Sequence, residues 1–393
     1  MMKTTKNNNL TCDIGHLSLN HYGEQLCGDH VDVVEEGDTT IIVLADGLGS
    51  GVKASILSTL TSKIISTMLA AGLGLRDAVE TIAATLPICL ERKTAFSTFT
   101  IIRIIGNQHA DIIQYENPNV IMMRNGRHYE FPLTTMQIGE KSIFRSSIEL
   151  ADGDTFIAMS DGVLYASDDG VLNNDWSRDK LIEFIEPITD ANFTAKVLAS
   201  IILDETNKLY GGKPFDDATV CVLKIKERQP MNIAIGPPKS RSDNKRMMSL
   251  FFAKEGHHIV CGGTTASIAA EFLGETVKVN ASSPDPDIPP TSEIKGIDLV
   301  TEGIITIDKV LIYAQDYLAD NKSFEQWSYK RDGASLVARM LFEDSTDINM
   351  FIGRAENRAH DSLSINFNVK MEIVHELAEC LEQMGKRVKM LYF

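Results

Sequence analysis

The chain has 393 residues, of which 44% are hydrophobic and 23% are charged, with 38 Lys and Arg against 54 Asp and Glu. This length exceeds one ordinary hydrophobic core and predicts two or three domains of ~150 residues each. The formal net charge of -16 opposes binding to phosphate backbones and to anionic lipid, so we expect neither a nucleic-acid partner nor a membrane partner.

The N-terminal ten residues are polar and rich in Asn, and they lack the apolar segment of a signal peptide. The longest apolar stretches, such as residues 41–45 and 101–105, have the length of strands and are too short to span a bilayer. The six cysteines are scattered and form no CxxC pair, which excludes a zinc ribbon and a dense disulfide framework. We therefore expect a cytoplasmic protein.

The first part of the chain, residues 1–228, combines many short strands with a few helices. Runs rich in Ile, Val, Thr and Phe predict strands at residues 30–35, 39–45, 98–104, 109–115, 120–124, 155–160 and 218–225. Apolar residues at spacings of three and four predict helices at residues 51–71, 76–90 and 180–210, the last broken near Pro187. Consecutive strands favour antiparallel sheet, with the helices packed outside it.

The second part, residues 229–393, alternates between predicted strands and helices. The strands are expected at residues 232–235, 258–261, 276–279, 297–300, 348–352 and 387–392. The helices are expected at residues 242–255, 265–273, 307–318, 334–342 and 371–384. This alternation predicts a smaller three-layer α/β domain, Rossmann-like, with a mostly parallel sheet covered on both faces.

Four acidic motifs of the first part each lie at the edge of a predicted strand. They are Gly28-Asp29, Asp46-Gly47, Asp161-Gly162 and Asp216-Asp217. Clustered carboxylates repel one another unless a cation compensates them, and oxygen ligands suit Mn²⁺ and Mg²⁺. Asp-Gly is also a common turn, so one motif alone is a weak signal. The ordered set of four favours a two-metal site, in which a bridging hydroxide is poised for in-line attack on phosphorus.

These motifs resemble the SpoIIE-type branch of the metal-dependent type-2C Ser/Thr protein phosphatases, and the resemblance covers residues 12–226. The matching text is Cys-Gly-Asp at 27–29, Leu-Ala-Asp-Gly-Leu-Gly-Ser-Gly-Val-Lys-Ala at 44–54, Asn-Pro-Asn-Val at 117–120, Ser-Asp-Gly-Val at 160–163 and Asp-Asp-Ala-Thr-Val at 216–220. The resemblance implies an αββα sandwich of two antiparallel sheets flanked by helices, with two metals at one end. It also implies a bacterial signalling hydrolase that removes phosphate from Ser or Thr of a protein partner, in this branch an anti-sigma-factor antagonist type domain.

The resemblance also implies a role for each acidic position. By position, Asp46 would bridge both metals, and the Gly47 carbonyl would bind one of them. Asp161 and Asp216 would complete the first metal site, and Asp29 would serve the second metal. Asp217 would support these ligands. Catalysis would then depend most on Asp46 and Asp161, with no side-chain nucleophile. Leu48 stands where eukaryotic members carry a His that could protonate the leaving group, so the acid for that step stays open. Lys53 is a candidate phosphate contact, although a solvated lysine is the simpler interpretation.

Two further hypotheses concern regulation in the first part. The helix at residues 51–71 carries apolar residues expected to pack in the core, including Val52, Ile56 and Leu60. The resembling family uses this helix as a switch that responds to regulators or to dimer contacts, so a homodimer is possible here. The alternative to an enzyme is a pseudophosphatase, a signalling module that binds its partner without chemistry.

Loops at the ends of predicted strands suggest a ligand site in residues 229–393. The candidate residues are Gly262, Gly263, Thr264, Thr265, Glu302, Arg354 and Arg358. Carboxyl-end loops line the crevice of an open parallel sheet, and a Gly-Gly turn at a helix start can bind an anion through backbone N–H groups. Tight turns and solvated arginines are the simpler alternative. We expect a regulatory or sensing domain with a small-molecule or anion ligand, or else a second enzyme that makes the chain bifunctional.

Overall fold

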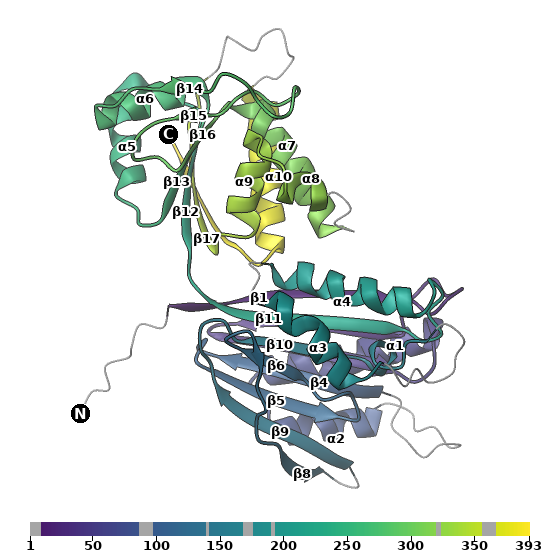
Figure 1. The fold of residues 1–393 in the computed structure, drawn as a ribbon. Coiled ribbons are helices and arrows are strands. Elements are labelled where there is room, and N and C mark those ends of the chain that lie inside the picture. Colours follow the sequence, from purple (N-terminus) through teal and green to yellow (C-terminus); the bar gives the residue numbers. More distant parts are fainter. Residues whose placement is uncertain are drawn as a thin grey trace, which may run out of the picture. The chain divides into compact units, whose positions relative to one another are not determined.

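The structure is a computed structural model that describes residues 9–85, 97–138, 141–167, 176–189, 193–319, 324–355 and 367–393. The chain forms two compact units, which divide between Glu227 and Arg228. Figure 1 labels their helices and strands. Among the helices in the described ranges, none combines the length and the apolar composition that crossing a membrane would require.

The described strands of the first unit form two antiparallel sheets. One has the order β1-β11-β10-β6-β7 and contains β1 (Leu10–Leu19), β6 (Ile121–Arg124), β7 (Arg127–His128), β10 (Thr155–Met159) and β11 (Ala218–Glu227). The other has the order β2-β3-β4-β5-β9-β8 and contains β2 (Asp29–Glu36), β3 (Thr39–Gly47), β4 (Ser97–Ile105), β5 (His109–Tyr115), β8 (Thr134–Ile138) and β9 (Lys141–Glu149). Buried residues such as Ile42, Phe156 and Leu223 fill the space between the two sheets.

Helices cover the outer faces of both sheets (Figure 1). The six-stranded sheet packs against α1 (Gly51–Ala70) and α2 (Leu75–Thr85) through residues such as Ile65 and Ile101. The five-stranded sheet packs against α3 (Arg178–Thr189) and α4 (Ala195–Leu209) through residues such as Ile157 and Leu198. The first unit is therefore the αββα sandwich that the sequence predicts.

The prediction for the apolar residues of α1 was partly wrong. Ile65 and Leu69 are buried as expected, but Val52, Ile56 and Leu60 are 60%, 54% and 45% exposed. The buried face of α1 is rich in small polar residues instead. Ser62 and Ser66 hydrogen-bond to His30 and Asp32 of β2, so polar contacts join this helix to the strand beneath it.

The second unit is built on a mostly parallel sheet of the order β14-β15-β16-β13-β12-β17-β18, as predicted. Its parallel strands are β12 (Pro230–Ile235), β13 (His257–Cys261), β16 (Leu299–Thr301), β17 (Asp347–Ile352) and β18 (Arg387–Tyr392). The short strands β14 (Lys278–Val279) and β15 (Ser292–Glu293) pair antiparallel at one edge. The chain first builds outward from β12 to β13 and β16, and then resumes on the other side of β12 with β17 and β18.

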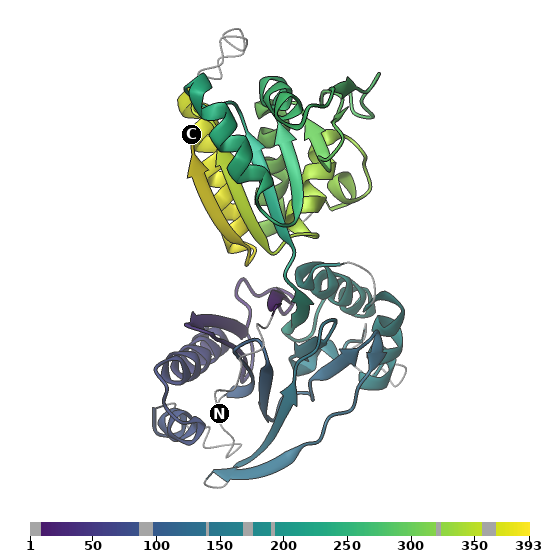
Figure 2. The ribbon, with the colours of Figure 1, turned by 90° about the vertical axis from the view of Figure 1, so that its left-hand side faces the viewer.

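Helices lie on both faces of this sheet, as Figures 1 and 2 show. One face carries α5 (Asn244–Phe252) and α6 (Gly263–Leu273), whose residues Phe251 and Ala269 pack with Val260 and Phe351 of the strands. The other face carries α7 (Ile304–Leu318), α8 (Phe324–Ser328), α9 (Gly333–Phe342) and α10 (Phe367–Gln383). This three-layer arrangement confirms the predicted fold class of the second unit.

Candidate functional site

The four acidic motifs lie at one end of the sandwich because of how the strands pair. In the six-stranded sheet, Asp29 at the start of β2 lies directly opposite Asp46 near the end of β3. In the five-stranded sheet, the end of β10 pairs with the start of β11, which places Asp161 near Asp216 and Asp217. Each sheet therefore presents carboxylates at the same edge, which we call the acidic edge and define as these five aspartates.

Ser160 joins the two halves of the acidic edge. Its fully buried hydroxyl donates a hydrogen bond to Asp29 Oδ2 at 2.7 Å and accepts one from the backbone N–H of Thr219 at 2.9 Å. One side chain thus connects both sheets at the point where the carboxylates meet. In the sequence, Ser160 lies inside an acidic motif, but no role for it was predicted. Its position directly before Asp161-Gly162 was the available signal.

Glycines of these motifs allow unusually close backbone packing. A Cβ added to Gly47 would lie 2.2 Å from the carbonyl oxygen of Ala54 in α1, and one added to Gly28 would lie 2.9 Å from the Ala54 Cβ. This added Cβ on Gly28 would also lie 2.7 Å from Asp217 Oδ2. Since only glycine fits there, α1 touches the residues next to Asp29 and Asp46.

The carboxylates of the acidic edge destabilise one another's charged forms. Burial raises the pKa of Asp46 well above its usual range, and the nearby charges of Asp29 and Asp161 raise it further. Burial also raises the pKa of Asp29, against hydrogen bonds from Ser160 and Thr219 that lower it. The pKa of Asp216 is raised to about 6, by burial first and then by the Asp161 charge. Such a cluster favours either protons or a compensating cation.

The unpaired oxygens of the acidic edge fit a divalent cation. Asp29 Oδ1 and Asp217 Oδ2 are buried and have no hydrogen-bond partner among the described residues. A hard cation prefers such oxygens. In the described part of the chain, however, no three His, Cys, Asp or Glu side chains already converge as a metal-binding group. Repulsion between ionised carboxylates opposes that convergence, and a cation would offset the repulsion.

The ligand residues predicted for the second unit fall into two groups. Gly262 has a positive φ of 113° and directly precedes α6. A Cβ added to Gly303 would lie 3.5 Å from the Gly262 Cα, so the end of β13 lies close to the end of β16. Thr265 is buried, Gly263 and Thr264 are exposed, and Glu302 accepts a hydrogen bond from the N–H of Gly303. Arg354 instead follows β17 and lies over the Tyr392 ring at 4.7 Å. Arg358 lies outside the described residues.

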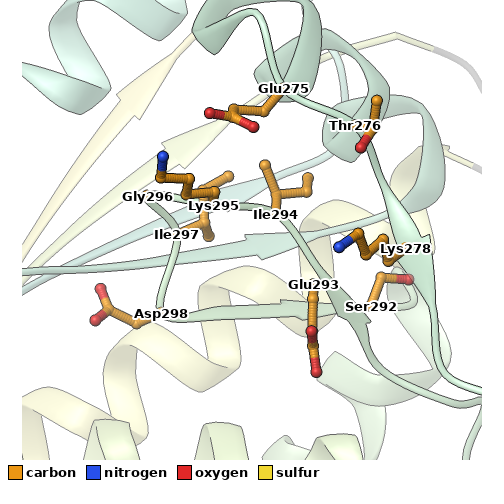
Figure 3. A pocket seen from close by; sticks show the side chains of 10 residues that line it. All are labelled: Glu275, Thr276, Lys278, Ser292, Glu293, Ile294, Lys295, Gly296, Ile297 and Asp298. Atoms are coloured by element: carbon orange, nitrogen blue, oxygen red, sulfur yellow. The ribbon is translucent and has the colours of Figure 1, made fainter.

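A pocket of about 430 Å³ in the second unit lies away from all of these loops. Glu275, Glu293 and Asp298 line it together with Lys278 and Lys295, next to the amino end of β16 (Figure 3). Four of these five charged side chains are exposed, and only Glu275 is partly buried. Solvated charges of both signs select poorly for one ligand, so the pocket gives no functional assignment.

Comparisons with known proteins find similarity in the first unit. Residues 36–226 match the family model "Stage II sporulation protein E (SpoIIE)". Stage II sporulation protein E of Bacillus subtilis is 25% identical over 225 residues, which cover 55% of this chain and 26% of that protein, so the match spans about a quarter of its length.

Two solved structures are also similar to this chain. One is the phosphatase domain of the cell fate determinant SpoIIE from Bacillus subtilis, with 21% identity over 56% of this chain and 95% of that one and a TM-score of 0.43. The other contains the RsbU and RsbW domains of a Mycobacterium tuberculosis protein, with 16% identity over 62% of this chain and 70% of that one and a TM-score of 0.48. Residues 36–226 are thus similar to the SpoIIE family, and the match ends before the second unit begins.

Proposed function

We propose that the first unit is a Mn²⁺- or Mg²⁺-dependent phosphatase that hydrolyses phosphoserine or phosphothreonine on a partner protein. The observation that carries this proposal is the acidic edge, where aspartates from two sheets gather with unpaired buried oxygens. Its residues are those that the SpoIIE resemblance assigns to metals, and the family match over residues 36–226 supports it as well.

The chain's own residues would hold the ions and shape the site. Two bound divalent ions supply the positive charge that activates water and neutralises phosphate. Asp29, Asp46, Asp161 and Asp216, with the Gly47 carbonyl, would bind them, while Asp217 is fixed by the backbone N–H of His21 at 3.0 Å. Leu48 carries no proton donor. Tyr210 already donates its hydroxyl proton to the Gly162 carbonyl at 2.7 Å, so neither residue is an obvious acid for the leaving group.

Exposed apolar side chains support a protein substrate. Leu26, Leu48 and Phe215 are 48%, 36% and 49% exposed, and each lies within three residues of an aspartate of the acidic edge. Val52 and Ile56 of α1 add to them. Large exposed apolar side chains near a site favour protein–protein contact over binding of a small metabolite. We extend the proposal to a small anti-sigma-factor antagonist type domain as the partner.

Substitution of the aspartates tests the proposed activity. In the full chain with Mn²⁺, Asp46→Asn and Asp161→Asn should lower hydrolysis of a small aryl phosphate by at least about a hundredfold, because removing a charge that holds the ions removes their stabilisation of the transition state. Asp38→Asn is the matched control, since Asp38 is exposed and precedes β3 at its opposite end. Full activity in both test variants would rule out this mechanism.

The second unit is proposed to sense a ligand and to regulate the phosphatase. Its support is the separate fold, with its own sheet and no share in the acidic edge. Deleting residues 231–393 should leave a fragment that hydrolyses the aryl phosphate at a changed rate. An unchanged rate and an unchanged response to candidate ligands would refute regulation. A new activity in the isolated second unit would instead favour a second enzyme.

A further inference from the structure

The strand order of the second unit reverses between β12 and β17, which are neighbours in the sheet (Figure 1). In open parallel sheets, ligands bind outside the carboxyl ends of the strands at such a reversal. Here Gly236 follows β12 and Gly353 follows β17, and the Gly353 N–H bonds the Ile235 carbonyl at 3.0 Å. A Cβ on Gly353 would lie 2.1 Å from the Pro237 oxygen, so the two loops pack backbone against backbone.

The loops that begin at Gly236 and Gly353 meet at a place that we call the junction. Lys370, in the first turn of α10, places its ammonium group there. Its Nζ donates a hydrogen bond to the Gly353 carbonyl at 2.7 Å, and a Cβ on Gly236 would lie 2.2 Å from the same Nζ. An ammonium group has three donors. No carboxylate within hydrogen-bond reach of Lys370 is found among the described residues. Burial lowers the pKa of Lys370 to about 8, which reflects the cost of a cation without a counter-charge.

Lys386 provides a contrast within the same unit. It is buried, and its Nζ donates to the carbonyls of Phe342 at 2.6 Å and Ser345 at 2.7 Å. These bonds close the loop that follows α9, so Lys386 has a structural role. Among the residues that the structure describes, Lys370 makes one such bond, and it lies where a ligand is expected. Lys386 thus has two carbonyl partners that account for its burial, whereas Lys370 has donors left for a ligand.

Other cationic residues belong to the two loops or directly follow them in the sequence. The guanidinium of Arg354 lies over Tyr392, and the backbone N–H groups of Arg354 and Lys239 both approach the Phe393 carbonyl, at 2.9 and 3.4 Å. Residues 236–246, which lead from β12 into α5, contain Lys239, Arg241, Lys245 and Arg246 but only one acidic residue. This positive stretch is unusual in a chain with a net charge of -16.

We propose that the carboxyl ends of β12 and β17 bind a small molecule through an oxyanion, a phosphate or a carboxylate, with Lys370 as its central contact. Lys370 would direct its two remaining donors to the oxyanion, and Arg354 would add a second positive charge from the next residue after Gly353. The glycines leave no side chain between the two loops and the ligand. This site differs from the pocket in Figure 3, which lies beside the amino end of β16.

Calorimetric titration of the full chain tests this site. The protein is first stripped of divalent ions with a chelating resin, and it carries Asp46→Asn so that phosphate has no metals to bind in the first unit. Inorganic phosphate and malonate are titrated separately at constant ionic strength. We expect at least one of them to bind, Lys370→Gln to weaken it by at least about tenfold, and Lys370→Arg to retain part of the affinity.

Matched variants make the result decisive. Lys389→Gln removes an exposed lysine of β18 and should leave binding unchanged. Arg354→Gln keeps Lys370 in place and should weaken binding by a smaller factor, which tests the site even if Lys370→Gln unfolds. Binding of phosphate alone or malonate alone would identify the oxyanion. The proposal is overturned if neither binds, or if folded Lys370→Gln and Arg354→Gln proteins bind as tightly as their parent.

Discussion

The acidic edge of the first unit and the junction around Lys370 in the second unit carry opposite charges without full compensation. At the acidic edge, several carboxylates crowd together and two buried oxygens have no donor among the described residues. At the junction, a single ammonium group keeps one carbonyl partner. In both places strands end and glycines let backbones approach closely. A buried charge without a partner is costly, so each place favours a ligand of the opposite sign.

The two places also differ in the contacts that hold them. The acidic edge is fixed by Ser160, by Gly28 and Gly47, and by α1, which contacts both glycines through Ala54. The junction depends on one flexible side chain from α10 and on two loops. We therefore expect the acidic edge to respond strongly to packing changes that leave every carboxylate in place.

Overpacking beside the acidic edge should have the larger effect. Ala54→Leu inserts methyl groups between Gly28 and Gly47, where no space exists, and should cost about 1–3 kcal/mol of stability. By shifting the strand ends, it should also lower the Mn²⁺-dependent rate by up to about a hundredfold. Thermal unfolding and aryl phosphate hydrolysis measure the two effects. Thr67→Leu, at an exposed position of α1, is the control. Normal rates in a folded Ala54→Leu protein would show that α1 is not coupled to the edge.

Loss of the Ser160 hydroxyl should have a smaller effect. Ser160→Ala leaves Asp29 Oδ2 and the N–H of Thr219 without their buried partner, at a cost of about 1–3 kcal/mol. Because Asp29 loses its orientation, we expect Mn²⁺ affinity to fall by about tenfold or more. Ser142→Ala removes an exposed hydroxyl of β9 and serves as the control. Equal Mn²⁺ affinity in Ser160→Ala and the parent would remove Ser160 from the account.

The sequence foretold the acidic edge better than the junction for a physical reason. Each acidic motif is contiguous and directly adjoins a strand, so strand pairing alone brings the motifs together. The junction combines Gly236, Gly353 and Lys370, which lie far apart in the sequence and meet only through the order of the sheet. No local pattern marks Lys370, so Arg354 was predicted from the sequence and Lys370 was not.

Local patterns also misled at strands and helices with mixed polarity. The strand β1 was not predicted, although Leu10 to Ile14 alternate between apolar and polar residues, which is a strand pattern. The strand β9 was missed as well, and it contains two consecutive exposed residues, Phe144 and Arg145, which interrupt its alternation. In α1 the apolar spacing predicted a core face that includes Val52 and Ile56, whereas serines fill much of the buried side. Which face of such a helix is buried depends on tertiary packing, and apolar spacings of three and four residues alone do not determine it.

Titration of the full chain with Mn²⁺ tests the central claim most directly. Calorimetry of resin-treated protein should show saturable binding of about two ions, as expected for carboxylates that share a bridging aspartate. Asp46→Asn should abolish or strongly weaken that binding, and Asp38→Asn should not change it. Absence of Mn²⁺ and Mg²⁺ binding in folded parent protein would contradict the account. The first unit would then be a partner-binding module without phosphatase chemistry.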